Sequence, residues 1–105
     1  MRLGFLKFFV LAYALAPSVA FSQSLGGAML GNTCAGCHGT LGAAENVKIP
    51  PLAGLDAAQF AATMRAYRDG SQGATIMNRV ARAYSDAEID AMAAYFATLP
   101  KQANE

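Results

Sequence analysis

Both cysteines of this 105-residue chain and its only histidine lie within five consecutive positions, in the segment NTCAGCHGT at residues 32–40. Cys34 and Cys37 are three residues apart, and His38 follows directly. A disulfide between the two cysteines would close a very small ring, constrain little of the unfolded chain's entropy and leave the histidine unexplained. The gathering of all these ligands in one segment predicts that the fold is built around a group bound there.

The spacing Cys-x-x-Cys-His is the attachment signature of a c-type haem. Two thiols at this spacing can each bond one vinyl carbon of the haem, and His38 then reaches the iron as the proximal ligand. A zinc site would need a fourth ligand and usually a second Cys or His pair, which the chain lacks. A haem-free, redox-active dithiol stays as an alternative, but it expects a β-α-β setting and the sequence predicts no strands. We therefore expect one covalent haem c on Cys34 and Cys37.

The first twenty residues have the pattern of an export signal that is removed. Arg2 and Lys7 form a positive region, FFVLAYALA is apolar but too short to span a membrane, and residues 18–20 are small. We expect cleavage after Ala20 or a few residues later, one domain over residues 21–105, and a periplasmic location. An uncleaved N-terminal anchor is the alternative.

Charge excludes two classes of partner. Loss of Arg2 and Lys7 leaves six basic residues against seven acidic ones, a formal charge of −1. Nucleic acids and anionic membranes would each require a clustered excess of lysine and arginine. We therefore expect no nucleic-acid partner, and no membrane association after cleavage.

Hydrophobic spacing predicts helices joined by irregular loops, at residues 24–33, 56–69 and 85–99. Asp56 with Gln59, and Ser85 with Glu88, have the spacing of capping boxes, and Gly70 is a stop signal. Residues 39–54 and 71–75 are expected to be loops. The apolar residues expected on buried helix faces are Leu25, Met29, Leu30, Leu55, Phe60, Met64, Tyr67, Ile89, Met92, Tyr95, Phe96 and Leu99. Arg65 and Arg68 are expected to face water.

The second iron ligand must come from the five methionines, since no second histidine exists. The initiator methionine leaves with the leader or by itself. Met29 lies beside the attachment site in the first helix, and Met64 and Met92 lie on apolar helix faces, where methionine usually fills a core. Met77 follows a glycine-bearing loop 39 residues beyond His38, far enough for the chain to wrap round a haem. Because a thioether is a soft ligand suited to iron, we expect Met77 to be the distal ligand.

The attachment motif, IPPLAG at residues 49–54 and YSDAEIDAMAAYFATL at residues 84–99 together resemble the class I cytochromes c, over about residues 24–100. The resemblance implies an all-α, monohaem fold whose N- and C-terminal helices cross around the covalent haem. Gly26 or Gly27 against Tyr95 is the expected crossing point.

The same resemblance supplies an acceptor for the proximal histidine. Pro50 stands twelve residues after His38, the spacing at which this family places a carbonyl against the ring of the proximal histidine. The sequence departs from many class I cytochromes after the ligand methionine, where Asn78 and Arg79 stand in place of a nearby proline.

More closely, ATIMNRVARAYS at residues 74–85 resembles the cytochrome subunits of flavocytochrome c sulfide dehydrogenases. That resemblance implies a heterodimer in which an FAD-containing flavoprotein oxidises sulfide and passes electrons to this haem. The alternative is a free soluble cytochrome that shuttles electrons between respiratory or photosynthetic complexes. Free carriers often bear a ring of lysines, whereas only Lys48 and Lys101 remain here after cleavage, which favours the complex.

Imidazole and thioether ligation fills both axial positions and favours ferrous iron, so we expect transfer of single electrons and no catalysis by this chain alone. Asp86, Glu88 and Asp90 offer no acid/base site, since capping and the helix dipole account for carboxylates at a helix start. Arg79 and Arg82 flank the expected ligand loop, where contact with a partner, a haem propionate or solvent is equally compatible with the sequence.

Overall fold

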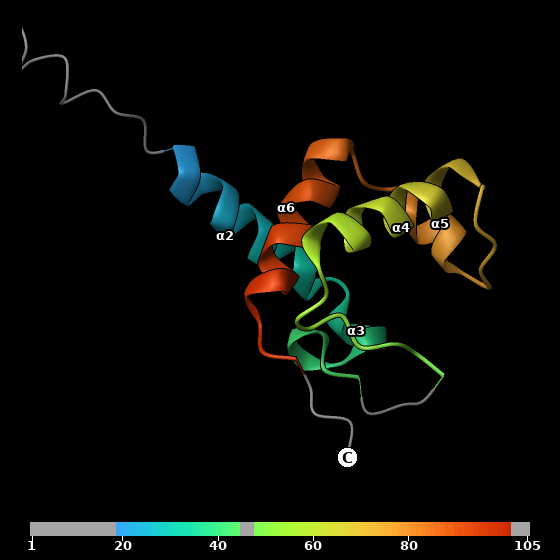
Figure 1. The fold of residues 1–105 in the computed structure, drawn as a ribbon, viewed down its shortest axis with the longest axis horizontal. Coiled ribbons are helices and arrows are strands. Elements are labelled where there is room, and N and C mark those ends of the chain that lie inside the picture. Colours follow the sequence, from blue (N-terminus) through green and yellow to red (C-terminus); the bar gives the residue numbers. More distant parts are fainter. Residues whose placement is uncertain (1–18, 45–47, 102–105) are drawn as a thin grey trace, which may run out of the picture.

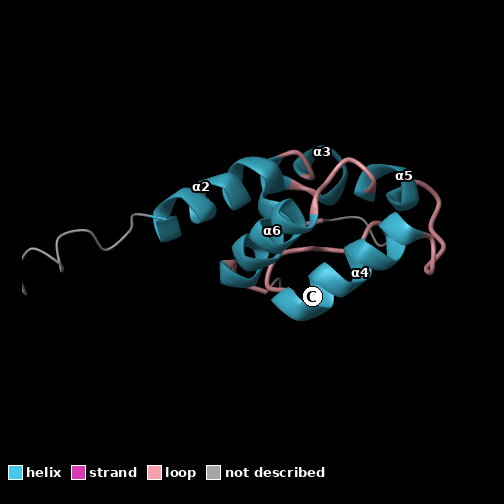
Figure 2. Ribbon diagram, turned by 90° about the horizontal axis from the view of Figure 1, so that it is seen from above, coloured by secondary structure: helices cyan, strands magenta, loops and turns pink. Residues whose placement is uncertain are grey.

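The computed structural model describes residues 19–44 and 48–101, and every regular element among them is a helix (Figure 1). In chain order the elements are α2 (Val19–Asn32), α3 (Ala35–His38), the short 3-10 helix η2 (Thr40–Gly42), α4 (Ala57–Asp69), α5 (Met77–Ala81) and α6 (Asp86–Thr98). The all-α prediction is confirmed, and the view from above in Figure 2 shows helices and loops throughout. The predicted leader lies outside the described residues apart from Val19 and Ala20, which begin α2. Within the described ranges, no helix combines the length and the hydrophobicity needed to cross a membrane.

The N- and C-terminal helices, α2 and α6, cross in close contact (Figures 1 and 2). A Cβ atom added to Gly27 would lie 2.4 Å from the carbonyl oxygen of Ala91, and one added to Gly31 would lie 2.6 Å from the ring of Tyr95. Gly26 has nothing within 4 Å of the same position. Of the two glycines expected at the crossing, Gly27 is therefore the one that makes it, and Gly31, one turn later, is a second contact that the sequence analysis missed.

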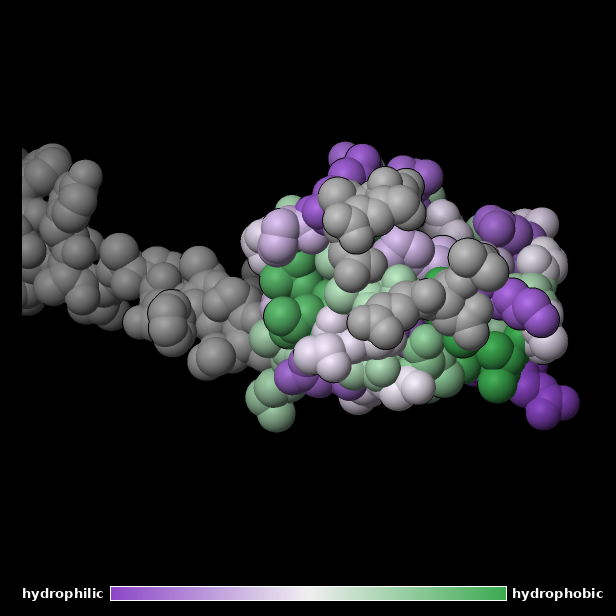
Figure 3. Space-filling view, turned by 90° about the horizontal axis from the view of Figure 1, so that it is seen from below, coloured by the Kyte–Doolittle hydropathy of each residue, from purple (hydrophilic) through white to green (hydrophobic). Residues whose placement is uncertain are grey.

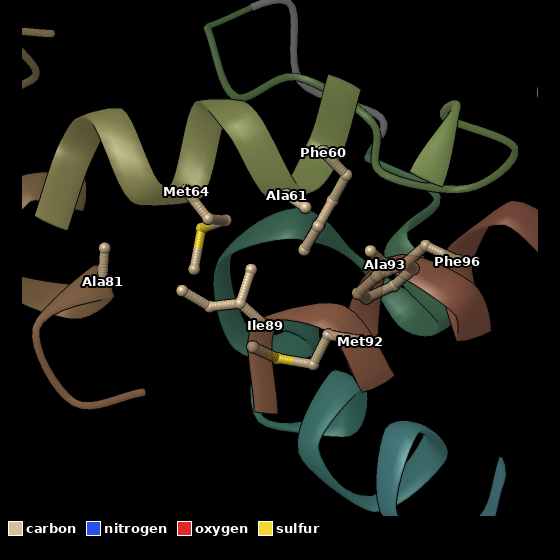
Figure 4. Packing of buried hydrophobic residues seen from close by; sticks show 8 residues of the cluster. All are labelled: Phe60, Ala61, Met64, Ala81, Ile89, Met92, Ala93 and Phe96. Atoms are coloured by element: carbon tan, nitrogen blue, oxygen red, sulfur yellow. The ribbon is translucent and has the colours of Figure 1, made fainter. Parts of the chain in front are cut away.

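A small cluster of buried side chains joins α4, α5 and α6 (Figure 4). Its members are Phe60, Ala61, Met64, Ala81, Ile89, Met92, Ala93 and Phe96. Leu30, Leu52, Leu55, Tyr67, Tyr95 and Leu99 are partly buried and pack against it. The assignment of Met64 and Met92 to the core is confirmed. The expectation for Met29 is wrong, because the residue is 73% exposed, and the side chain of Leu25 lies outside what the structure describes.

Local capping signals fix the starts of α4 and α6. The Asp56 carboxylate accepts a hydrogen bond from Gln59 N at 2.9 Å, and α4 ends at Gly70 in the left-handed conformation. Ser85 Oγ accepts from Glu88 N at 3.2 Å, while Glu88 Oε1 accepts from Ser85 N at 3.0 Å. This reciprocal pair is the predicted capping box, and α6 therefore begins where the sequence placed it.

The start of α6 is also tied to α4 by ion pairs that the sequence analysis did not anticipate. Arg65 contacts Asp86 at 3.0 Å and Asp90 at 2.7 Å, and Arg68 contacts Asp86 at 2.6 Å. The two arginines expected to face water thus link α4 to carboxylates of α6. Because these side chains are partly exposed, the pairs align α4 with α6 more than they stabilise the fold.

Candidate haem-binding site

The two cysteines lie on a single turn of helix. Cys34 precedes α3 directly, and its carbonyl accepts from Cys37 N at 3.2 Å and from His38 N at 2.9 Å. With 3.6 residues per turn, positions three apart lie on similar sides of a helix, so Cys34 and Cys37 are presented to one neighbouring group. Cys34 packs against the core, Cys37 is exposed, and both thiols are free.

His38 ends α3 and is held by the loop that follows it. The side chain is buried, with 8% of the residue exposed, and its Nδ1 lies 2.7 Å from the carbonyl oxygen of Pro50. Because a carbonyl can only accept, Nδ1 is the nitrogen that donates, which leaves Nε2 of the neutral ring with a lone pair. The described residues offer Nε2 no hydrogen-bond partner. His38 is therefore oriented with one nitrogen engaged and the other available to a metal.

Gly42 turns the chain so that Pro50 can reach the histidine. It has a φ of 72°, and a Cβ there would lie 2.8 Å from the ring of Phe96. Its carbonyl accepts from Leu52 N at 2.8 Å and from Ala53 N at 3.2 Å. The segment beyond Pro50 is thus folded back onto the end of η2. The sequence predicted the role of Pro50 but not that of Gly42, which is recognisable only as a glycine four residues after the histidine.

Met77 begins α5, and its half-buried side chain packs against the hydrophobic core. The residue before it, Ile76, is 60% exposed, and Leu41, three residues after His38, is 51% exposed at a φ of 55°. Large apolar side chains therefore stand in water next to both predicted ligand segments. Figure 3 shows apolar surface in separate areas of the face that it views.

These features fit a haem. Within the part of the chain that the structure describes, the buried core is small for a domain, since four of its nine hydrophobic residues are alanine. A covalently held macrocycle would supply apolar surface that the chain lacks. Among the described residues, no three His, Cys, Asp or Glu side chains are grouped so that they could hold a metal ion by themselves. The donor set, two thiols and one oriented imidazole, matches haem attachment.

The surroundings of Cys34 lack the activation that the attacking thiol of a redox-active dithiol has. Burial raises the pKa of the Cys34 thiol above its ordinary value, and the negative charge of a Cys37 thiolate would raise it further, although a hydrogen bond with Thr33 opposes both. Reactive dithiols instead have a lowered pKa, because the thiolate is the attacking species. Cys34 is therefore a poor redox nucleophile in this fold.

Comparison with known families agrees with this donor set. Residues 23–96 match the model of the family described as cytochrome c oxidase, cbb3-type, subunit III. The chain is a class I c-type cytochrome. It carries covalently bound haem c, and its function is electron transfer. The small all-α fold with crossing terminal helices is the fold expected of this family.

Similar proteins come from several bacteria. The chain is 35% identical over 89 residues to the cytochrome subunit of sulfide dehydrogenase from Chlorobaculum tepidum, a match that covers 85% of this chain and 80% of the relative. It is 39% identical over 69 residues to the thiosulfate dehydrogenase electron acceptor of Stutzerimonas stutzeri, covering 63% of this chain and 32% of that protein. It is 33% identical over 90 residues to cytochrome c-553 of Nitratidesulfovibrio vulgaris, covering 82% of this chain and 88% of that one.

Proposed function

We propose that Cys34 and Cys37 form the two thioether bonds to the haem and that Nε2 of His38 is the proximal iron ligand. The hydrogen bond from Nδ1 to Pro50 O supports this assignment, because it fixes the ring tautomer and orientation and makes the free nitrogen a better donor. Met77 is proposed as the distal ligand. It is a half-buried methionine at a helix start, whereas Met64 and Met92 are committed to the core and Met29 points into solvent.

When bound, the haem iron gains or loses one electron at a time. The chain's own part is to hold the iron in a fixed setting in both oxidation states. His38 is held by its carbonyl partner, and the two cysteines anchor the group to the turn that carries the histidine. With His38 and Met77 as its two protein ligands, a bound haem would keep no coordination site open to a substrate, so the domain would pass electrons and leave bond chemistry to a partner.

We further propose that the partner is an FAD-containing flavoprotein that oxidises sulfide, with this chain as the haem subunit of the complex. The observation that carries this proposal is the similarity to the cytochrome subunit of sulfide dehydrogenase, which extends over 80% of that relative. Sulfide that becomes elemental sulfur releases two electrons, so the flavoprotein must deliver them singly, and a downstream acceptor must remove each one in turn.

The second candidate is a free electron carrier. Two similarities favour it. One is to cytochrome c-553, and the other is to cytochrome c-554(548) of Halomonas halodenitrificans, at 36% identity over 69 residues. In both cases we propose an exported, periplasmic protein from which residues 1–20 are removed, because haem attachment at Cys34 and the leader pattern point to the same compartment.

The test is gentle isolation of the protein from the native exported fraction, followed by an optical spectrum that records the ferrous haem and the flavin together. Haem with an equal amount of flavin on a co-purifying partner, reduced by sulfide, is the expected result. Reduction by thiosulfate but not by sulfide would change the proposed donor. Haem alone on a stable monomer would support the free carrier, and a colourless protein with titratable thiols would refute both candidates.

A further inference from the structure

The side chain of Asn78, the residue after Met77, makes three hydrogen bonds, all of them to main-chain atoms. Its Oδ1 accepts from Ala74 N at 2.8 Å. Its Nδ2 donates to the carbonyl oxygen of Tyr67 at 2.9 Å and to that of Gln72 at 2.7 Å. The partners fix the orientation of the amide, because a main-chain N–H can only donate and a carbonyl can only accept. One half-buried side chain thereby joins the last turn of α4, the start of α5 and the loop at residues 70–76 between them.

These bonds close the loop that leads to Met77. The first part of the loop is held to α4 without Asn78, since Gln72 N donates to Ala66 O at 3.1 Å and Ser71 N donates to Asp69 Oδ1 at 2.8 Å. Residues 73–76 are exposed. In the described part of the chain, the hydrogen bonds that join residues 73–76 to α4 all run through Asn78. Without this amide, an exposed, glycine-bearing stretch would lead directly into Met77.

We propose that Asn78 is a positioning residue for the distal iron ligand, an inference that rests on the proposed role of Met77. In many class I cytochromes a proline close behind the ligand methionine restricts the backbone. Here Asn78 restricts it by hydrogen bonding and therefore lowers the entropy that Met77 must lose when it binds iron. Asn78 stabilises iron–methionine ligation without touching the iron.

Imidazole binding to the ferric holoprotein tests this proposal, because imidazole takes the distal position only where the methionine has left it. Asn78→Ala removes all three bonds and should raise the apparent imidazole affinity about 10- to 100-fold. Asn78→Asp keeps the acceptor for Ala74 N but turns a carboxylate oxygen toward the carbonyl oxygens of Tyr67 and Gln72, and because these groups repel, it should raise the affinity at least as much. Gln72→Ala is the matched control. It removes only an exposed side-chain contact with the Tyr67 hydroxyl at 3.4 Å and should leave the affinity unchanged.

Amide hydrogen exchange at Ala74 provides a readout that does not depend on the iron. Exchange in Asn78→Ala should be at least about tenfold faster than in the wild type. Unchanged imidazole affinity in Asn78→Ala would overturn the proposal, whether or not Ala74 exchange changes. The ligand assignment itself is tested by Met77→Ala, which should lose the weak red absorption band of thioether-ligated ferric haem. If that band persists in Met77→Ala while Asn78→Ala speeds Ala74 exchange, Asn78 holds the loop at residues 73–76 but this loop carries no iron ligand. The positioning role is then refuted.

Discussion

The crossing of α2 and α6 allows a paired test of the packing, in which alanine replaces two adjacent glycines of one helix. Gly26 and Gly27 both lie inside α2, so alanine at either position gains about 1 kcal/mol from helix propensity. At Gly26 the new Cβ meets nothing within 4 Å. At Gly27 it would lie 2.4 Å from Ala91 O and 3.0 Å from Ala91 C, main-chain atoms that cannot rotate away.

The two helices must therefore separate in Gly27→Ala until that contact exceeds the 3.0 Å below which real Cβ contacts essentially never occur. Overpacking of this kind costs about 1–3 kcal/mol. Gly26→Ala should be more stable than the wild type, and Gly27→Ala should be about 1–3 kcal/mol less stable than Gly26→Ala. For a domain of this size, each kcal/mol shifts Tm by about 4–8 °C.

Thermal unfolding of the haem-loaded proteins, followed by circular dichroism, measures the difference. Gly31→Ala is an intermediate case, since its Cβ would meet the ring of Tyr95, which has some freedom to turn. Equal or greater stability of Gly27→Ala relative to Gly26→Ala would refute the argument that main-chain contact at Gly27 sets the distance between the helices.

Two further predictions concern surface contacts. Thr33 Oγ1 lies 2.8 Å from the Tyr84 hydroxyl and links the residue before Cys34 to the segment after α5, so Tyr84→Phe should cost about 0.5–1.5 kcal/mol in urea unfolding. Thr33→Val also loses the bond from Thr33 Oγ1 to Leu30 O at 2.6 Å, so it should cost less in the Tyr84→Phe background than alone, and additive effects would show that the pair is not coupled. The second concerns Asp86, whose pKa is lowered by hydrogen bonds from Arg68 and then Arg65. A carboxyl with a lowered folded-state pKa stabilises the fold above its unfolded value of about 4, and that contribution is lost as pH falls through the folded pKa. The Tm of the wild type should therefore drop more than that of Asp86→Asn between about pH 5 and about pH 2, and parallel curves would contradict the assignment.

The parts of this protein that the sequence could predict depend on neighbours in the chain. The spacing of Cys34, Cys37 and His38 is short enough that one helical turn presents the whole motif, whatever surrounds it. The N-cap hydrogen bond at Asp56 and the capping box at Ser85 likewise join residues three positions apart. The helical character of the chain, the starts of α4 and α6 and the haem-attachment chemistry could therefore be predicted before any tertiary contact was known.

Other features depended on contacts between distant segments, which local patterns do not encode. Periodicity placed Met29 on a buried face, but α6 packs against Gly27 and Gly31 of α2 and leaves Met29 in water. Arg65 and Arg68 were expected to be solvated, and only the approach of α6 to α4 supplied Asp86 and Asp90 as partners.

The sequence by itself determined that the chain is helical, that it is a c-type cytochrome, and which residues are candidates for attachment and ligation. Only the tertiary structure decided which glycine brings α2 against α6, and how Gly42 folds the loop back so that Pro50 reaches His38. It also showed that Asn78 ties the loop before Met77 to α4. The physical reason is the separation along the chain of the residues that decide each feature. Ligand spacing and capping are set by residues within one helical turn, whereas close packing and loop closure depend on which distant backbone atoms arrive within hydrogen-bonding or van der Waals distance.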